Sequence, residues 1–315
     1  MRTIESYNTE QKERYLSEIS DSYATDVIIN IRSVFNRTGP FEEMLGKDIC
    51  NFSREEISDM YALLMYSSKY VYSSVNSRLR AYVEWCLSQM LVNDGCNHFQ
   101  EFSLVDFEKY VNKRVLSNKY ITRETYCNIL KGIPNPRDKF LLMCLYEFGK
   151  STNFEDIFGM KIEDIDREKG VIRLRSGRIV KVSKELIATA IEANKDRRYL
   201  MPGREVYRNL LDSPYIFKRA KTAGEEIENI DNNNQNVKFV ARLIKNLMEY
   251  CGENSDINAT SIAVSGQFDM IRRRSNELKI TEKEYVFNYF DELTKQYKTS
   301  PNKAKSYWDR YEAYL

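Results

Sequence analysis

Basic residues that could bind phosphate groups are concentrated in one short segment of the chain. Residues 170–182 alternate apolar and basic positions around Ser176-Gly177, a pattern that predicts a β-hairpin with a two-residue turn. The basic side chains of this segment are Arg173, Arg175, Arg178 and Lys181. In that register the three arginines share one face of the sheet, and the lysine fits it only in a shifted register. We expect this face to contact phosphate, which attracts cationic donors, although a solvated surface is the alternative.

Other basic and polar groups are weaker candidates for the same chemistry. They are Lys218 and Arg219, which are interleaved with aromatic residues, the pair Thr260 and Ser261, and the run Arg272, Arg273 and Arg274. The alternative for the arginine run is a helix C-terminus where cations compensate the helix dipole. Thr260 could equally cap a turn, and the lysine and its neighbour could lie on an ordinary surface loop.

A long helix is predicted over residues 72–91, with an apolar stripe at helical spacing. The polar residues that flank the stripe are Ser74, Asn76, Arg78 and Arg80. Side chains of these types read base edges and bind phosphates when a helix enters the major groove, so we interpret this face as a DNA-reading surface. A solvated helix face is the alternative.

The sequence lacks the residues that most other chemistries need. His98 is the only histidine, so acid–base catalysis by histidine has one candidate, and we expect it to be structural. The six cysteines form no CxxC pair, and no Walker loop or GxGxxG motif is present, so we expect no metal site and no small-molecule cofactor. The net charge of +2 is too small to indicate nucleic-acid binding without the local clusters.

These residues must be positioned by a mainly α-helical chain with one small antiparallel sheet, an α+β fold. Only 12 Gly and 6 Pro occur in 315 residues, which favours long helices. Ser53 and Glu56 form a capping-box pattern at a helix start, and Gly39-Pro40 is expected to end a helix. The two prolines of 132–136 predict a domain boundary, giving domains of residues 1–131 and 132–315. Apolar runs are too short to span a bilayer and no signal core opens the chain, so we expect a cytoplasmic protein with no membrane partner.

A family resemblance covers nearly the whole chain. Residues 135–149, the segment Met160-Lys161-Ile162-Glu163-Asp164-Ile165-Asp166 and the following hairpin resemble the catalytic domain of tyrosine recombinases, the phage integrase family. Residues 46–85 resemble their helical, SAM-like core-binding domain. The chain also resembles integrase-like repressors of SPβ-type Bacillus phages, which use this fold without recombining.

The resemblance implies a site of two arginines, a lysine, proton-shuttling histidines and a tyrosine nucleophile, and this chain departs from it. Asn153 falls on the first arginine position, and Arg175 or Arg178 on the lysine position. Thr260 and Ala263 fall on the histidine and second arginine of the HxxR box. The tyrosines near the nucleophile position are Tyr307, Tyr311 and Tyr314. Because each missing electrostatic donor costs on the order of 10²–10³ in rate, we expect no catalytic residues and no enzyme activity.

The sequence therefore predicts a sequence-specific double-stranded DNA-binding transcriptional regulator, of the phage lysogeny repressor type, in the host bacterial cytoplasm at the nucleoid. One alternative is a divergent, active recombinase in which Lys150, an arginine of the hairpin and Tyr307 rebuild the site. Another is an interaction protein with no nucleic-acid role. Residues 297–315 could exchange between copies in a homo-oligomer on DNA, or fold back on their own domain.

Overall fold

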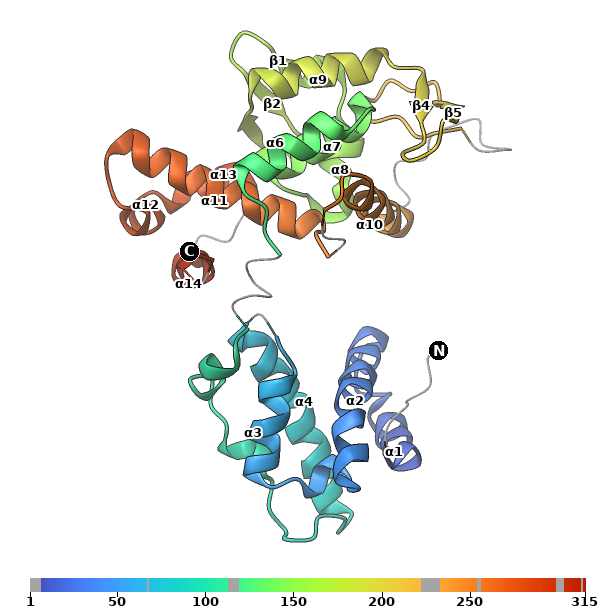
Figure 1. Cartoon of the computed structure of the whole chain (residues 1–315), viewed down its shortest axis with the longest axis vertical. Coiled ribbons are helices and arrows are strands. Elements are labelled where there is room, and N and C mark those ends of the chain that lie inside the picture. The colour runs from blue at the N-terminus through green and yellow to red at the C-terminus, as the bar shows by residue number, and fades with distance from the viewer. Residues whose placement is uncertain are drawn as a thin grey trace. The chain divides into compact units, whose positions relative to one another are not determined.

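The protein consists of two compact units, each with its own hydrophobic core (Figure 1). The computed structural model describes residues 7–66, 68–112, 119–221, 233–253, 256–298, 303–312 and 314–315. The first unit is Met1–Leu116 and the second is Ser117–Leu315. The mainly α-helical fold with small antiparallel sheets, predicted from the sequence, is confirmed.

All regular structure in the described residues of the N-terminal unit is helical. Its helices are α1 (Thr9–Ile19), α2 (Thr25–Leu45), α3 (Arg54–Leu63) and α4 (Lys69–Ser88), with the 3₁₀ helices η1 (Ile49–Asn51), η2 (His98–Glu101) and η3 (Asp106–Tyr110). Edge-to-face aromatic pairs fill the core, among them Phe35 with Tyr82 and Tyr61 with Tyr72. The predicted capping box at Ser53 and Glu56 is present at the start of α3.

One helix of this unit is longer than the sequence predicted. Helix α2 continues through Gly39 and Pro40 to Leu45, so the predicted break at this dipeptide is wrong. Gly39 and Glu42 are buried in the helix, and α2 packs against α1 and α4. Tertiary packing of this face therefore outweighs the local cost of an internal proline.

The C-terminal unit is built around one buried helix. Its helices are α6 (Arg123–Gly132), α7 (Pro136–Phe148), α8 (Glu155–Phe158), α9 (Lys184–Lys195), α10 (Asn233–Tyr250), α11 (Ala259–Leu278), α12 (Glu282–Asn288), α13 (Phe290–Tyr297) and α14 (Ala304–Glu312), with 3₁₀ turns η4 (Thr152–Phe154) and η5 (Ile162–Asp164). Helix α7 packs against α9 and α11 and is buried along most of its length. Gly266 of α11 allows this close packing, because a Cβ there would lie 1.7 Å from the carbonyl oxygen of Tyr146.

Two small antiparallel sheets are formed by the described residues of the C-terminal unit. The first has the order β1-β2-β3, formed by Ile165–Asp166, Val171–Arg173 and Ile179–Lys181. The second pairs β4 (Arg198–Leu200) with β5 (Tyr207–Asn209), and it was not predicted. Its strands have three residues each and follow no alternating apolar pattern, so no strand signal marks them along the chain.

The boundary between the units lies earlier in the chain than the 131/132 division that the prolines indicated. The division falls between Leu116 and Ser117. Helix α6 belongs to the C-terminal unit because Tyr126 and Ile129 are part of its core. The prolines of residues 132–136 therefore separate two packed helices within one unit. Among the described residues, no helix has the length and apolar character needed to cross a membrane.

Candidate nucleic-acid interface

The hairpin register differs from the predicted one by one residue in the turn. Arg173 pairs with Ile179 and Ile172 with Val180. The Leu174 N–H donates to the Arg178 carbonyl at 2.8 Å, and the Leu174 carbonyl accepts the Gly177 N–H at 2.9 Å. The turn therefore contains three residues, 175–177, and Gly177 adopts the positive φ of 82° that this turn requires. The predicted two-residue turn is wrong.

This register changes which cations share a face. Arg173 pairs with Ile179, and Lys181 pairs with Val171. Because side chains alternate along a strand, Arg173 and Lys181 lie on the same exposed face as diagonal neighbours. Lys181, which the sequence analysis placed on the arginine face only in a shifted register, is therefore a full member of it. Arg178 lies on the opposite, half-buried face, so the predicted three-arginine face is wrong. Within the described residues, neither Arg173 nor Lys181 forms an ion pair.

A buried carboxylate holds the hairpin turn. Asp156 of α8 accepts hydrogen bonds from the Ser176 amide at 2.8 Å and from its hydroxyl at 3.0 Å. The Arg178 guanidinium lies 3.4 Å from the same carboxylate. Arg175 is exposed at the turn, and its side chain packs along Gly159, where an added Cβ would lie 3.3 Å from the Arg175 Cδ. Arg178 is thus a structural partner of Asp156, whereas Arg175 is at the surface.

Helix α4 presents only part of the predicted DNA-reading surface. Ser74 and Arg80 are exposed and Arg78 is half-buried, with its guanidinium donating to the Ser74 carbonyl at 3.0 Å. Arg80 forms an exposed ion pair with Glu84. Asn76 is only 6% exposed, and it accepts from the Tyr61 hydroxyl and donates to the Phe99 carbonyl. Its placement on the DNA-reading surface was wrong, because it turns inward to satisfy buried polar groups.

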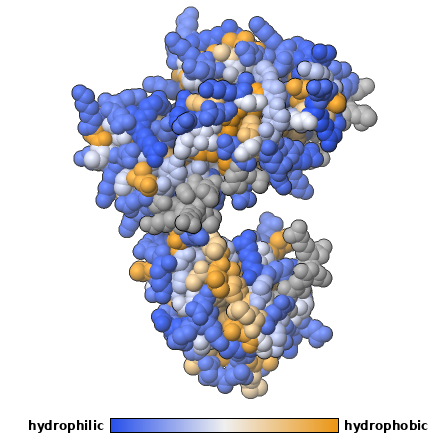
Figure 2. Space-filling view, viewed as in Figure 1, coloured by the Kyte–Doolittle hydropathy of each residue, from blue (hydrophilic) through white to orange (hydrophobic). Residues whose placement is uncertain are grey.

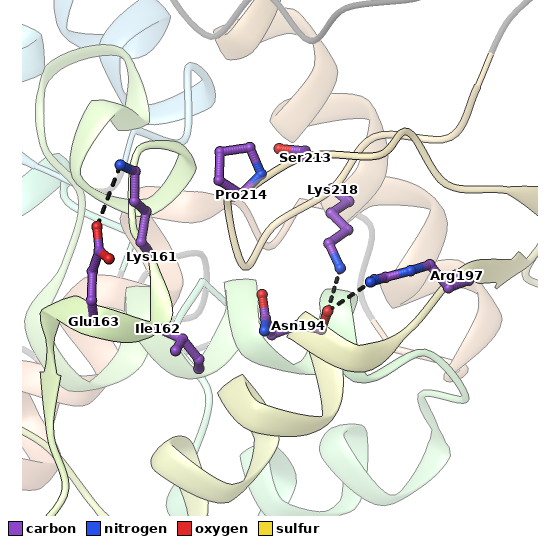
Figure 3. A pocket seen from close by; sticks show the side chains of 8 residues that line it. All are labelled: Lys161, Ile162, Glu163, Asn194, Arg197, Ser213, Pro214 and Lys218. Atoms are coloured by element: carbon purple, nitrogen blue, oxygen red, sulfur yellow. Dashed lines mark hydrogen bonds and ion pairs between the residues drawn. The ribbon is translucent and has the colours of Figure 1, made fainter.

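Lys218 lines a surface pocket of about 300 Å³, but its ammonium is directed at the protein (Figure 3). The side chain is 1% exposed and donates to the carbonyl of Asn194 and, at 3.3 Å, to that of Asp196. Arg197 donates to the same two carbonyls, and both cations thereby neutralise the C-terminal end of α9. The prediction that Lys218 contacts phosphate is therefore wrong.

Arg219 is also engaged within the protein. Its guanidinium bonds the buried Asn236 side chain and lies over the rings of Phe158 and Phe239, at 5.7 and 5.5 Å from the centroids. The cation–π contacts and the hydrogen bond fix this arginine in the core that α8 and α10 share. The predicted phosphate contact does not agree with this half-buried position.

The polar pair at the start of α11 divides between surface and interior. Asn258 caps the helix by accepting from the amides of Thr260 and Ser261. Thr260 is exposed, while Ser261 is 1% exposed and its hydroxyl has no hydrogen-bond partner among the described residues. Thr260 can therefore reach a ligand, and Ser261 cannot, so its predicted DNA contact is wrong.

The arginine run of α11 is mostly paired. Arg274 bonds Glu292 at 3.0 Å and Glu277 at 2.6 Å, and these carboxylates raise its pKa. Arg272 donates to the Tyr311 hydroxyl at 3.0 Å. Arg273 is the exposed member of the run. Pairing with α13 and α14, rather than helix-end compensation alone, accounts for two of the three arginines.

A cationic face on α10 was not among the predicted site residues. Lys238, Arg242 and Lys245 are all exposed and are spaced by four and three residues, so they lie on one side of the helix. Lys245 has one weak ion pair, with Glu249 at 3.8 Å. The basic cluster was visible in the sequence, and the helical spacing of the three cations was the signal that could have added them to the site.

Several positions that the family resemblance assigned to chemistry have local structural roles. Asn153 has a left-handed φ of 54° within η4. Ala263, on the second arginine position, is buried in α11. Tyr307 and Tyr311 are buried against the C-terminal helices, and burial raises the pKa of both phenols. Among the described residues, no group of three or more His, Cys, Asp or Glu could hold a metal ion.

The two units correspond in order to the core-binding and catalytic domains of an integrase-like protein, as the sequence analysis predicted. Two family models match the chain. The model described as "MrpR, N-terminal core-binding domain" matches residues 6–88, and that described as "MrpR, C-terminal catalytic domain" matches residues 120–312. The chain belongs to the MrpR family.

Solved structures with loosely similar architecture are recombinases and integrases. XerA recombinase is 12% identical over 96% of this chain and 93% of its own, with a TM-score of 0.42. A lambda integrase dimer bound to a COC′ core site is 12% identical over 96% of this chain and 77% of its own, with a TM-score of 0.48. The integrase of mycobacterium phage Brujita is 13% identical over 94% and 96% of the two chains, at a TM-score of 0.32. No curated protein matches the chain.

Proposed function

We propose that this chain is a sequence-specific regulator that binds double-stranded DNA, in the manner of a phage lysogeny repressor, on a recombinase fold that no longer cleaves strands. The observation that carries the proposal is the exposed hairpin face with Arg173 and Lys181, which have no ion pair among the described residues. A cation that already has a carboxylate partner adds little DNA-binding free energy, because it must be desolvated and lose that partner. A cation without an ion pair can bind a phosphate directly and release counterions from DNA.

Two further surfaces support nucleic-acid binding. The cationic face of α10 adds Lys238, Arg242 and Lys245 for backbone contacts. On the N-terminal unit, Ser74 and Arg78 of α4 offer side chains that can read base edges, and Arg80 can do so once it leaves Glu84. In Figure 2, hydrophilic residues cover most of the visible face of the C-terminal unit, which suits a polar partner. Such a protein acts in the cytoplasm of its bacterial host.

The proposed loss of cleavage is supported by the groups at the positions where the family has its chemistry. Asn153, Thr260 and Ala263 supply no cation and no imidazole. His98, the only histidine, belongs to the N-terminal unit, where its ring nitrogens bond Asp94 and Glu101. A phosphoryl-transfer site without its cationic donors loses most of its stabilisation of the transition state.

The experiment that tests binding selects genomic DNA fragments with the full chain and titrates the selected duplex with salt. We expect a retained fragment class whose affinity falls steeply as salt rises, because phosphate contacts release counterions. Affinity that is equal for random duplex would contradict sequence specificity. Absence of any DNA complex at low salt would favour an interaction protein without a nucleic-acid role.

A second experiment separates this proposal from a divergent, active recombinase. A suicide duplex traps the covalent phosphotyrosine that a cleaving enzyme forms. We expect no adduct with the full chain. If an adduct forms and Tyr307→Phe abolishes it, the chain is an active enzyme and the proposed loss of cleavage is wrong.

The C-terminal helix bears on the oligomeric state. Helix α14 packs against α12 within the same unit, with Tyr307 and Tyr311 buried. The described residues 303–312 pack on their own domain in this single chain, and exchange of residues 297–315 between copies in a homo-oligomer on DNA stays the alternative.

A further inference from the structure

Strand β3 is an edge of its sheet, and half of its backbone groups point away from β2. In an antiparallel ladder, alternate residues bond the partner strand. The Val182 amide donates to the Gly170 carbonyl and the Leu174 amide to the Arg178 carbonyl, so the even-numbered residues of β3 face β2. Lys181 therefore directs its N–H and its C=O outward. An edge with such groups needs a partner or water.

One side chain of α13 satisfies both of these groups. The Gln296 Oε1 accepts the Lys181 N–H at 3.3 Å, and its Nε2 donates to the Lys181 carbonyl at 2.7 Å. The same Nε2 donates at 2.8 Å to the Glu147 carbonyl at the end of α7. The amide group of Gln296 thus replaces one residue of a neighbouring strand and connects the hairpin edge to the central helix.

The backbone of Gln296 also holds the turn end of the hairpin. Arg178 donates from its Nη1 to the Gln296 carbonyl at 3.0 Å. Arg178 in turn contacts Asp156, which binds the turn at Ser176. A continuous set of contacts therefore runs from α13 through the hairpin to α8.

Helix α13 is itself fixed, so it can act as a support. Leu293 and Tyr297, on either side of Gln296, are buried. The Tyr297 hydroxyl donates to the Tyr146 carbonyl at 2.7 Å, and its ring lies 3.3 Å from where a Cβ on Gly149 would be. These contacts leave Gln296 little freedom to move away from β3.

We propose that Gln296 is a positioning residue that holds the edge of the hairpin, so that Arg173 and Lys181 face a DNA backbone as a preordered pair. This inference rests on the proposed DNA-binding function. Without Gln296 the outward groups of Lys181 bind water, and DNA binding must then order the strand. The free energy needed to order the strand lowers the affinity for DNA, although both cations are still present.

The first measurement is hydrogen exchange of the hairpin amides, which needs no DNA. Gln296→Ala should speed exchange of the Lys181 amide on the order of fivefold or more, because one hydrogen bond and its support are lost. Gln296→Glu is a second variant, whose carboxylate would face the carbonyls of Lys181 and Glu147. Lys295→Ala, an exposed neighbour on the same helix, is the matched control and should leave exchange unchanged.

The second measurement is DNA affinity of the full chain as a function of salt. We expect Gln296→Ala to weaken binding about fivefold with an unchanged salt slope, since the number of phosphate contacts stays the same. In the Arg173→Ala, Lys181→Ala background the same substitution should have no further effect. A role in stability alone would weaken both backgrounds equally.

The outcomes separate this inference from the function on which it rests. No DNA binding by the unchanged chain overturns both. Binding by the unchanged chain with unaltered Lys181 exchange in both Gln296 variants overturns the positioning role alone. Faster exchange with an equal loss of affinity in the two backgrounds also overturns it, because the effect would then not pass through Arg173 and Lys181.

Discussion

At the scale of single residues, burial and pairing separate the cations that can reach DNA from those that hold the fold. Arg173 and Lys181 are exposed, and no ion pair involves them among the described residues. Arg274 and Lys218 have the same charge but are held by carboxylates or backbone carbonyls. Charge type alone could not distinguish the two groups.

Removing the exposed pair should weaken DNA binding in a characteristic way. Arg173→Ala with Lys181→Ala should reduce the slope of log affinity against log salt by about two, because each lost contact releases about 0.9 counterion fewer. Fluorescence anisotropy at several salt concentrations measures this slope. Arg274→Ala is the control and should leave the slope unchanged. An equal change in the control would mean that the hairpin pair has no special role.

Asn76 is expected to affect stability and not DNA recognition. Asn76→Ala leaves the Tyr61 hydroxyl and the Phe99 carbonyl buried without their partner, which should cost about 1–3 kcal/mol of unfolding free energy. Urea denaturation of the full chain measures the loss. If the variant is stable yet changes the preferred DNA sequence, the inward placement of Asn76 is contradicted.

At the scale of elements, the close packing of α7 against α11 is the most sensitive contact. Gly266→Ala would place a methyl group 1.7 Å from the Tyr146 carbonyl oxygen, so the two helices must separate. We expect destabilisation of at least about 3 kcal/mol, the upper part of the range for overpacked cores. Thermal unfolding followed by circular dichroism tests this. The Gly177→Ala variant, in the hairpin turn, has open space around it, so it meets only the strain of its positive φ and should cost less.

Helices α1, α2 and α4 meet at a buried cluster of charged side chains that makes the stability of the N-terminal unit depend on pH. Lys12 lies 2.7 Å from Glu42 and 3.3 Å from Asp48, and Asp48 also accepts from the Tyr82 hydroxyl. One lysine faces two carboxylates, and the Glu42 Oε2 has no hydrogen-bond partner among the described residues. Burial therefore raises the pKa of Glu42 to about 7.

This pKa predicts that the N-terminal unit loses stability as pH rises. The pKa of Glu42 is higher in the folded state than its ordinary value of 4.5, so its protonated form stabilises the folded state. This stabilisation is complete below pH 4.5 and is lost as pH rises through about 7. The loss should be about 3 kcal/mol. Glu42→Gln should remove this pH dependence, and the exposed Glu43→Gln should retain it. Unfolding free energies at several pH values between 5 and 8 measure both, and parallel curves would contradict the assignment.

At the scale of the whole molecule, two separate cores predict two separable unfolding steps. The clusters of buried apolar residues are confined to one unit each. Calorimetry of the full chain should show two transitions, because each unit can melt on its own. Gly266→Ala should lower only the transition of the C-terminal unit. A single transition that shifts as a whole would contradict this independence.

The sequence by itself determined those features that neighbouring residues encode. The capping box at Ser53 and Glu56 and a mainly α-helical chain with a small sheet were both predicted. The family resemblance added the core-binding and catalytic-type domains. Caps, periodicity and glycine or proline content act over a few residues, so they can be read directly along the chain.

Only the tertiary structure decided which candidate residues remain available for a ligand. The hairpin register moved Lys181 onto the face of Arg173, Asn76 turned inward, and Arg178 found its partner in Gln296, 118 positions away. The domain boundary likewise depended on which core received α6. Charges and buried polar groups choose partners by distance in space, and spacing along the chain does not contain that distance.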